Sequence, residues 1–360
     1  MSSIRPSAEP GGEAAAEVTA EVAAEVTAPP PGAPLAAPRR RPPAGRAVAV
    51  LVLLAAATLI PLLGPSAALR GTGEAPAPGI SGITFLRTVM FAALCVQAGE
   101  VFATRLARRV PGAPLDRAPR CWSAYAAWAG CAAALALAAI VANGNLVPEH
   151  FSDLDLGRLS GSRDGRLALL EVNAFVVAAL CARSRRPASA ALPLAAVIVA
   201  EALRAHPPVE DHPLVGSGLT LVHLTCGMLW VGGLLYVLRT LRQWRSAAPE
   251  AAVAVLGLYA RVAAVLFAAI TVTGTVSTLR RMPPGTVADQ LTETAYGRTL
   301  LAKALLVAVV AVLALLARRR LHGAADRAGA YAPARREVVA LGVVVALSAL
   351  LTAVPVPIRW

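Results

Sequence analysis

The sequence predicts an all-α protein that crosses a membrane as a bundle of about nine helices. Hydrophobic residues make up 57% of the 360 residues, charged residues only 15%, and the mean hydropathy is +0.62. These values do not fit a soluble protein of this length. The apolar runs are continuous and rich in Ala, Leu and Val, which favours helices over the alternating strands of a membrane barrel.

The predicted helices follow from the apolar runs, because a span needs about 20 mainly apolar residues to cross roughly 30 Å of hydrocarbon. Nine segments come close to that length, and the fourth and fifth are the shortest. Their predicted bounds are 47–69, 83–104, 121–142, 166–182, 188–204, 214–238, 257–279, 299–317 and 337–354.

Residues 1–46 are predicted to be a disordered cytoplasmic tail. They contain repeated Ala-Glu-Val units and then the stretches PPPGAP and RRRPPAGR. Such a composition offers too little apolar surface to offset the entropy lost on ordering. A secretory signal peptide is not expected, because the first apolar run begins only near Ala47 and no clean cleavage site follows it.

The arginines predict the orientation of the bundle in the cytoplasmic membrane. The net charge is +13, but the basic residues sit in short clusters between apolar runs, which argues against a nucleic-acid partner. Alternate connections, beginning with the N-terminal tail, carry 21 arginines, and the opposite side carries nine. Since positive residues collect on the cytoplasmic side, we expect the N-terminus inside and the C-terminus outside a multi-pass protein of the lipid bilayer.

Six ionisable residues fall inside the predicted spans, where a charge costs about 3 kcal/mol or more. Four of them belong to the outer half of the bundle, and Glu100 and Arg261 lie nearer the cytoplasm. Each could be a snorkelling side chain or half of an ion pair between helices. The only lysine of the chain is expected to balance one of two glutamates. The outer four are Arg87, Glu171, Glu201 and Lys303, with Glu171 or Glu201 as the expected partner of Lys303.

Histidine and cysteine side chains in the outer half suggest a metal path. His206 and His212 flank a short connection, and His223 lies inside the sixth segment with Cys226 three residues later on the same helix face. Imidazole and thiolate suit copper. We expect His206 and His212 to collect the ion, and His223 to accept it with Glu201 or Cys226. The alternative for a lone membrane histidine is a hydrogen bond between helices.

Other chemistries lack their usual sequence features. The chain has no GxxxxGK[ST] loop, no GxGxxG after a strand and no GxSxG elbow, so we expect that it is not an enzyme. Bis-histidine haem needs paired histidines on facing helices, and only His223 is clearly inside a span. The five cysteines form no CxxC pair, which argues against a disulfide framework or a zinc knuckle.

Several segments of the second half resemble the copper resistance D (CopD) family. The sixth span reads LVHLTCGMLWVGGLLYVL from Leu221, the seventh contains RVAAVLFAAITVTGTVSTL from Arg261, and the eighth opens YGRTLLAKALLVAV from Tyr296. The last helix ends in TAVPVP. The resemblance covers about residues 200–357, and it divides the membrane part into five helices over 47–204 and a CopD-like domain of four spans over 205–357.

The resemblance implies a role in copper handling. By position, His223, Trp230, Gly232 and Gly233 match one family pattern, and Tyr296, Gly297, Arg298 and Lys303 match another. It also implies a separate extracytoplasmic copper-binding partner of the CopC type, because no such β-sandwich is fused to this chain. Independently of the family, Gly227, Gly232 and Gly233 together with Trp230 are expected to serve close helix packing.

Two functions remain open from the sequence. The first is a permease that moves copper ions across the cytoplasmic membrane, with copper bound transiently in the bundle. The second is a scaffold or assembly factor for a copper enzyme that transports nothing, in which the same patterns are helix-packing features.

Overall fold

A computed structural model describes residues 44–244, 246–282, 284–322 and 331–354 of the chain. Contacts divide the chain into Met1–Ala44 and Gly45–Trp360, and the second unit holds the described helices. The long helices are α2 (Ala44–Leu69), α3 (Ile80–Ala107), α4 (Ser123–Ala142), α6 (Arg163–Arg183), α7 (Ala191–Arg204), α8 (Pro213–Trp244), α9 (Pro249–Arg281), α11 (Ala295–His322) and α12 (Tyr331–Leu351). Short helices lie in the connections: η1 (Leu115–Arg117), η2 (Phe151–Asp153), α5 (Leu156–Gly161), η3 (Pro187–Ala190) and α10 (Val287–Glu293).

The predicted all-α fold class is confirmed. Within the described residues, eight helices are long and apolar enough to cross a membrane, and they coincide with the first eight predicted segments. The ninth predicted segment lies in α12, whose apolar described part, Val339–Leu351, is shorter. The tail prediction for 1–46 falls outside the described residues up to residue 43, and α2 begins at Ala44 rather than at residue 47.

Two helices extend well beyond their predicted bounds. The structure continues α8 to Trp244 and begins α9 at Pro249, so the pair forms a long hairpin. Polar residues ended the hydropathy windows early, but Trp244 and Leu256 in these extensions are buried in an apolar cluster that includes Leu106 of α3. Tertiary packing therefore continues both helices past the apolar windows that define a span.

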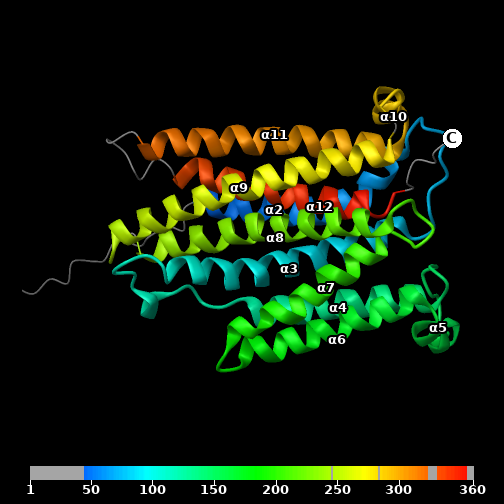
Figure 1. The fold of residues 1–360 in the computed structure, drawn as a ribbon, viewed down its shortest axis with the longest axis horizontal. Helices are drawn as coiled ribbons and strands as arrows, with labels where there is room; N and C mark the ends of the chain where they lie inside the picture. The colour runs from blue at the N-terminus through cyan, green and yellow to red at the C-terminus, as the bar shows by residue number, and fades with distance from the viewer. Residues whose placement is uncertain (1–43, 245, 283, 323–330, 355–360) are drawn as a thin grey trace, which may run out of the picture. The chain divides into compact units, whose positions relative to one another are not determined.

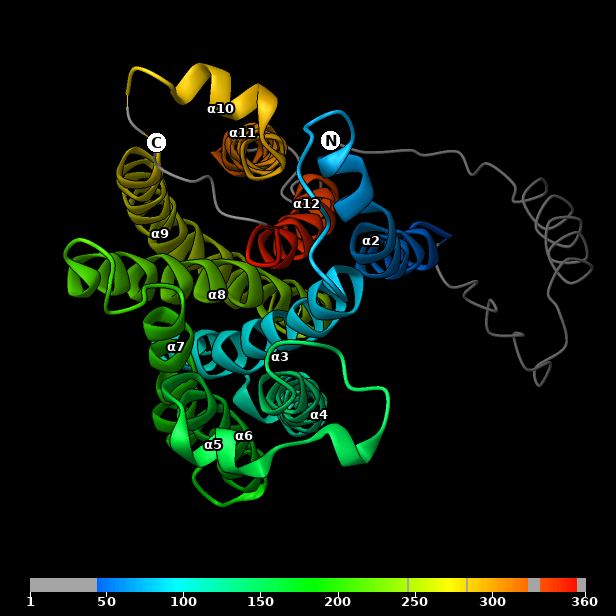
Figure 2. The same ribbon diagram turned by 90° about the vertical axis from the view of Figure 1, so that its right-hand side faces the viewer.

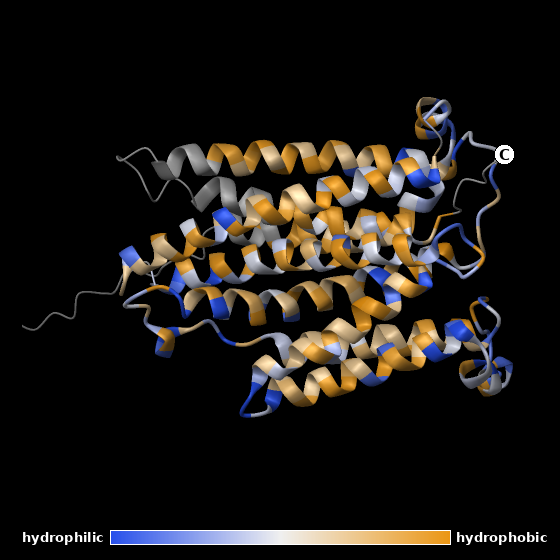
Figure 3. Ribbon diagram, in the orientation of Figure 1, coloured by the Kyte–Doolittle hydropathy of each residue, from blue (hydrophilic) through white to orange (hydrophobic). Residues whose placement is uncertain are grey.

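The helices pack around a central pair, α3 and α8 (Figures 1 and 2). One side of this pair carries α4, α6 and α7, with α4 on α3 and α7 on α8. The other side carries α9, which packs on α8, and α12, which packs on α3 and α11. Apolar residues run along the helix lengths and hydrophilic residues gather near the helix ends (Figure 3), as expected for spans in a bilayer.

Glycines bring the central pair into direct backbone contact. A Cβ built on Gly232 would lie 1.7 Å from the carbonyl oxygen of Cys95, and one on Gly99 would lie 2.1 Å from the carbonyl carbon of Gly232. Only residues without a side chain allow helices to approach so closely in a membrane. Beside them, Gly233 faces Tyr259, whose hydroxyl donates to the carbonyl oxygen of Trp230 at 2.6 Å.

A buried carboxylate joins several elements at one end of the bundle. Glu100 accepts hydrogen bonds from the backbone N–H of Trp122 at 2.9 Å and of Ser123 at 3.0 Å, at the start of α4. Negative charge is stabilised at a helix N-terminus. Arg239 of α8 donates to the same carboxylate at 2.8 Å and stacks on the Trp122 ring at 3.6 Å. We call this the Glu100 end, where α3 and α8 end and α4 begins.

Candidate functional site

The opposite end, where α7 and α9 end and α8 and α11 begin, is called the His206 end. The sequence from Ala205 to Pro213 cannot continue a helix, because prolines at 207 and 208 remove backbone donors and restrict the residues before them. His212 adopts a positive φ of 53°, and Pro213 then begins α8. The connection therefore turns sharply and brings His206 back onto the first turns of α8.

His206 is a buried histidine with both ring nitrogens engaged. Its side chain is 3% exposed, Nδ1 lies 2.7 Å from a Glu210 carboxylate oxygen, and Nε2 lies 2.9 Å from the Thr220 hydroxyl. A carboxylate only accepts, so Nδ1 carries the proton and Nε2 accepts from Thr220. Burial lowers the pKa of His206 and outweighs the opposite effect of the Glu210 carboxylate. The lowered pKa favours the neutral ring.

The His206 ring also requires Gly216. A Cβ at that position would lie 2.4 Å from Nδ1 of His206, so only glycine leaves room for the imidazole on the face of α8. Arg163 of α6 donates to the carbonyl oxygen of Leu203 at 2.6 Å and holds the end of α7 from the other side. His206 is thus fixed by packing as well as by hydrogen bonds.

His223 lies one turn further along α8 and has a free ring nitrogen. Its Nδ1 is 3.0 Å from the hydroxyl of Thr273 on α9, and that hydroxyl donates its only hydrogen within α9, to the carbonyl oxygen of Ala269 at 2.7 Å. With its hydrogen on Ala269, the Thr273 hydroxyl accepts from Nδ1–H of His223. The ring also interacts with the backbone of Ile270. No hydrogen bond within the described residues engages Nε2 of His223, so in this tautomer its lone pair is available to a ligand.

Thr220 of α8 connects the positions of the two histidines. His206 contacts Thr220, and Thr220 and His223 are three residues apart on α8, so they share a helix face at about 4.5 Å of rise. Sequence reasoning missed Thr220 and Thr273, because single hydroxyl residues in apolar helices carry no distinctive pattern. The one sequence feature that could have indicated Thr220 is its spacing of three residues from His223, which places both on one helix face.

The other expected metal ligands are placed differently. His212 is exposed, and its ring makes no hydrogen bond or ion pair with the described residues; its backbone carbonyl accepts from Arg280 at 3.3 Å. Cys226 is a half-buried free thiol one turn beyond His223. Among the described residues, no group of three or more His, Cys, Asp or Glu side chains is arranged to hold a metal ion. The five expected ligands therefore do not form one preformed cluster.

Glu201 belongs to a buried ion-pair chain. Arg87 of α3 contacts its carboxylate at 3.1 Å, and Arg204 contacts the same carboxylate at 2.9 Å. Arg204 also lies 3.0 Å from Glu171 of α6. The expected pairing of Lys303 with Glu171 or Glu201 is wrong, because arginines occupy both carboxylates. Arg204 ends the predicted fifth segment, and its spacing of three residues from Glu201 indicated the pair.

The remaining family-pattern residues tie elements together. Arg298 donates through Nε to the carbonyl oxygen of Thr292 at 2.6 Å and through Nη1 to that of Arg70, which joins α11 to α10 and to the end of α2. Trp230 packs edge-on against Phe267 of α9, with ring centroids 5.4 Å apart. These contacts position α9 beside α8, and α11 beside α10 and the end of α2.

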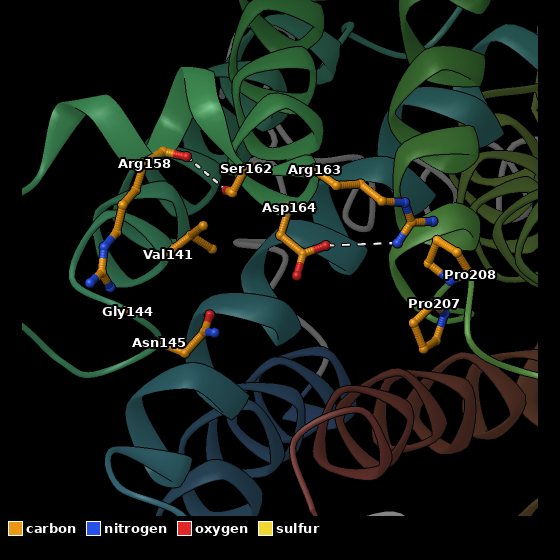
Figure 4. Close-up of a pocket in the computed structure, with 9 residues that line it drawn as sticks. All are labelled: Val141, Gly144, Asn145, Arg158, Ser162, Arg163, Asp164, Pro207 and Pro208. Atoms are coloured by element: carbon orange, nitrogen blue, oxygen red, sulfur yellow. Dashed lines mark hydrogen bonds and ion pairs between the residues drawn. The ribbon is translucent and has the colours of Figure 1, made fainter.

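A surface pocket opens beside the His206 connection (Figure 4). Its wall includes Arg158, Arg163 and Asp164, and the Pro207–Pro208 step lies at one side. Arg163 contacts Asp164 at 3.9 Å within the pocket and also donates to the carbonyl oxygen of His206 at 3.4 Å. The pocket is therefore connected to the histidine end of the bundle through one arginine.

Comparison with known proteins supports the resemblance in part of the chain. Residues 253–356 match the family model described as copper resistance protein D (CopD). The match runs from the fifth residue of α9 into the sequence after α12, and it includes Thr273, Arg298 and Lys303. No curated protein and no solved structure matches the chain significantly. The match to the copper resistance family thus falls on α9, α11 and α12 of a bundle of helices of membrane-spanning length.

Proposed function

We propose that this protein moves copper ions across the cytoplasmic membrane, with His223 as the ligand inside the bundle. The observation that carries the proposal is the free Nε2 of His223, whose other ring nitrogen donates to Thr273. Metal-binding histidines typically donate the second ring nitrogen to an oxygen in this way, which fixes the ring and its tautomer. The hydrogen bond to Thr273 therefore holds the His223 ring in the orientation of a metal ligand before any ion binds.

Cys226 supplies a second donor for the same ion. It follows His223 by three residues on α8, so both side chains lie on one helix face. Imidazole nitrogen and sulfur are ligands that suit copper, and a thiol releases its proton when a metal binds. A site with two protein ligands holds an ion loosely, which favours passage over storage.

His212 and His206 form the approach to this site in the proposed path. The ring of His212 is exposed, so it can capture an ion at the mouth. His206 contacts Thr220, which is one turn of α8 from His223, and Nε2 of His206 becomes a ligand when the Thr220 hydroxyl turns away. Because the arginine distribution assigns the His206 end to the outer side, this order carries copper inward. A separate extracytoplasmic carrier of the CopC type would deliver the ion.

The test compares copper in cells that lack other copper importers and express the protein or a variant. His223→Ala is expected to lower copper accumulation to the level of cells without the protein. His150→Ala, which removes an exposed histidine of a connection, is the matched control and is expected to leave accumulation unchanged. Equal accumulation with wild type and His223→Ala, at equal membrane levels, would contradict the proposal and favour the scaffold function.

A further inference from the structure

Lys303 is a cation without an anionic partner. It lies on α11, eight residues after Ala295, and within the described part of the chain it makes no hydrogen bond and no ion pair. A charge inside a membrane helix is costly, and such residues usually pair or face a functional cavity. An ion pair between helices therefore does not account for Lys303.

No carboxylate of the spans is available to neutralise this charge. Asp164 and Glu250 lie in the first turns of α6 and α9, at the ends of their spans. The other carboxylates within the described spans are Glu100, Glu171 and Glu201. Each of them already contacts an arginine, at 2.8 Å for Arg239 with Glu100, 3.0 Å for Arg204 with Glu171, and 3.1 Å for Arg87 with Glu201. The positive charge of Lys303 is thus left uncompensated within the described bundle.

The lysine lies at the depth of the His223 site. His223 follows the start of α8 by ten residues, Thr273 precedes the end of α9 by eight, and Lys303 follows the start of α11 by eight. At 1.5 Å per residue these positions are about 15, 12 and 12 Å from the same end of the bundle. His223 interacts electrostatically with Lys303, so the cation acts on any ion held at the imidazole.

We propose that Lys303 selects for singly charged metal ions at His223 and keeps their binding transient. The proposal rests on the function proposed above and specifies its ion. Coulomb repulsion is proportional to the charge of the bound ion, so a divalent ion meets twice the repulsion that Cu(I) meets. The low polarity of the bundle strengthens this difference. Copper therefore enters as Cu(I), and Zn²⁺ and Cu²⁺ are excluded by charge.

The experiment measures dissociation constants of Cu(I) and of Zn²⁺, each added alone, for purified full-length protein in detergent. Lys303→Gln removes the charge and keeps a polar chain. It is expected to tighten Zn²⁺ binding about tenfold more than Cu(I) binding. Lys303→Arg keeps the charge and is expected to keep the wild-type preference. Lys303→Met gives a second neutral variant, so the test does not depend on the folding of one protein.

Arg261→Gln is the matched control, because it removes the other unpaired span cation, which is exposed on α9 and nearer the Glu100 end. It is expected to leave the preference unchanged. A Zn²⁺ to Cu(I) ratio unchanged in both neutral variants would overturn the role of Lys303. That outcome is distinct from failure of the proposed function, in which His223→Ala binds Cu(I) as wild type does.

Discussion

At the scale of single residues, the hydrogen bond between His223 and Thr273 fixes the chemistry of the candidate site. The hydroxyl of Thr273 donates within α9 to Ala269, and in that arrangement it accepts from the imidazole. An oxygen that accepts from a metal-binding histidine orients its ring, and such a partner typically contributes about 10- to 100-fold to metal affinity. Thr273 is therefore a positioning residue in this account.

Replacing Thr273 by valine removes that acceptor and keeps the shape of the side chain. We expect Cu(I) affinity to fall by about tenfold, because Nδ1–H of His223 loses its partner and the ring its orientation. The measurement is competition with a Cu(I) chelator. Thr271→Val is the control, since Thr271 is exposed and bonds only within its own helix, to Phe267 at 2.9 Å. Equal losses in both variants would contradict the assigned role.

Cys121 gives a pH-dependent prediction at the Glu100 end. Burial first, and then the neighbouring Glu100 carboxylate, raises the pKa of this thiol. Its reactive thiolate is therefore scarcer in the folded protein, and alkylation at pH 8 should be slower than after denaturation in SDS. The difference between the alkylation rates of the native and the denatured protein should become smaller as the pH rises. The rate is followed by mass spectrometry of the Cys121 peptide, and a native rate at pH 8 that equals the denatured rate would refute the prediction.

At the scale of elements, the contact of α3 with α8 joins the N-terminal helices to the second half of the chain. A methyl group on Gly232 would overlap the Cys95 carbonyl, so Gly232→Ala must push the two helices apart. Overpacking of this kind costs about 1–3 kcal/mol. We expect a lower unfolding temperature and less monodisperse protein in size-exclusion chromatography.

Gly227→Ala is the control for that change. The expected close packing at Gly227 is wrong, because a Cβ there meets nothing within 4 Å. Its unfolding temperature should equal or exceed that of wild type, since alanine favours helix more than glycine does. If both variants unfolded at the wild-type temperature, the close crossing of α3 and α8 would not exist as described.

Elements were predictable from the sequence where hydropathy decides them. Apolar runs located eight spans, but the ends of α8 and α9 lay outside those runs, because Trp244 and Leu256 are buried by tertiary contacts that hydropathy does not report. In the site, the histidines were identifiable by residue type. Their partners were not, since the pairing of Glu201 with Arg87 joins residues 114 positions apart.

At the scale of the whole molecule, the account places the His206 end outside the cell. Single cysteines in a cysteine-free protein test this, at Val209, which is 92% exposed at that end, and at Ala247 in the exposed connection between α8 and α9. A membrane-impermeant maleimide should label Val209→Cys in intact cells and Ala247→Cys only after lysis. The reverse pattern would mean that the bundle is inverted and that the proposed direction of transport is wrong.

The central claim is that the free nitrogen of His223 binds copper inside the bundle. X-ray absorption of the Cu(I)-loaded, detergent-purified protein tests it most directly, because imidazole nitrogen and sulfur scatter distinguishably around the metal. The account predicts one histidine nitrogen and one sulfur around copper, and loss of the imidazole signal in His223→Ala. A copper environment without imidazole in the wild type, or an identical one in His223→Ala, would contradict it.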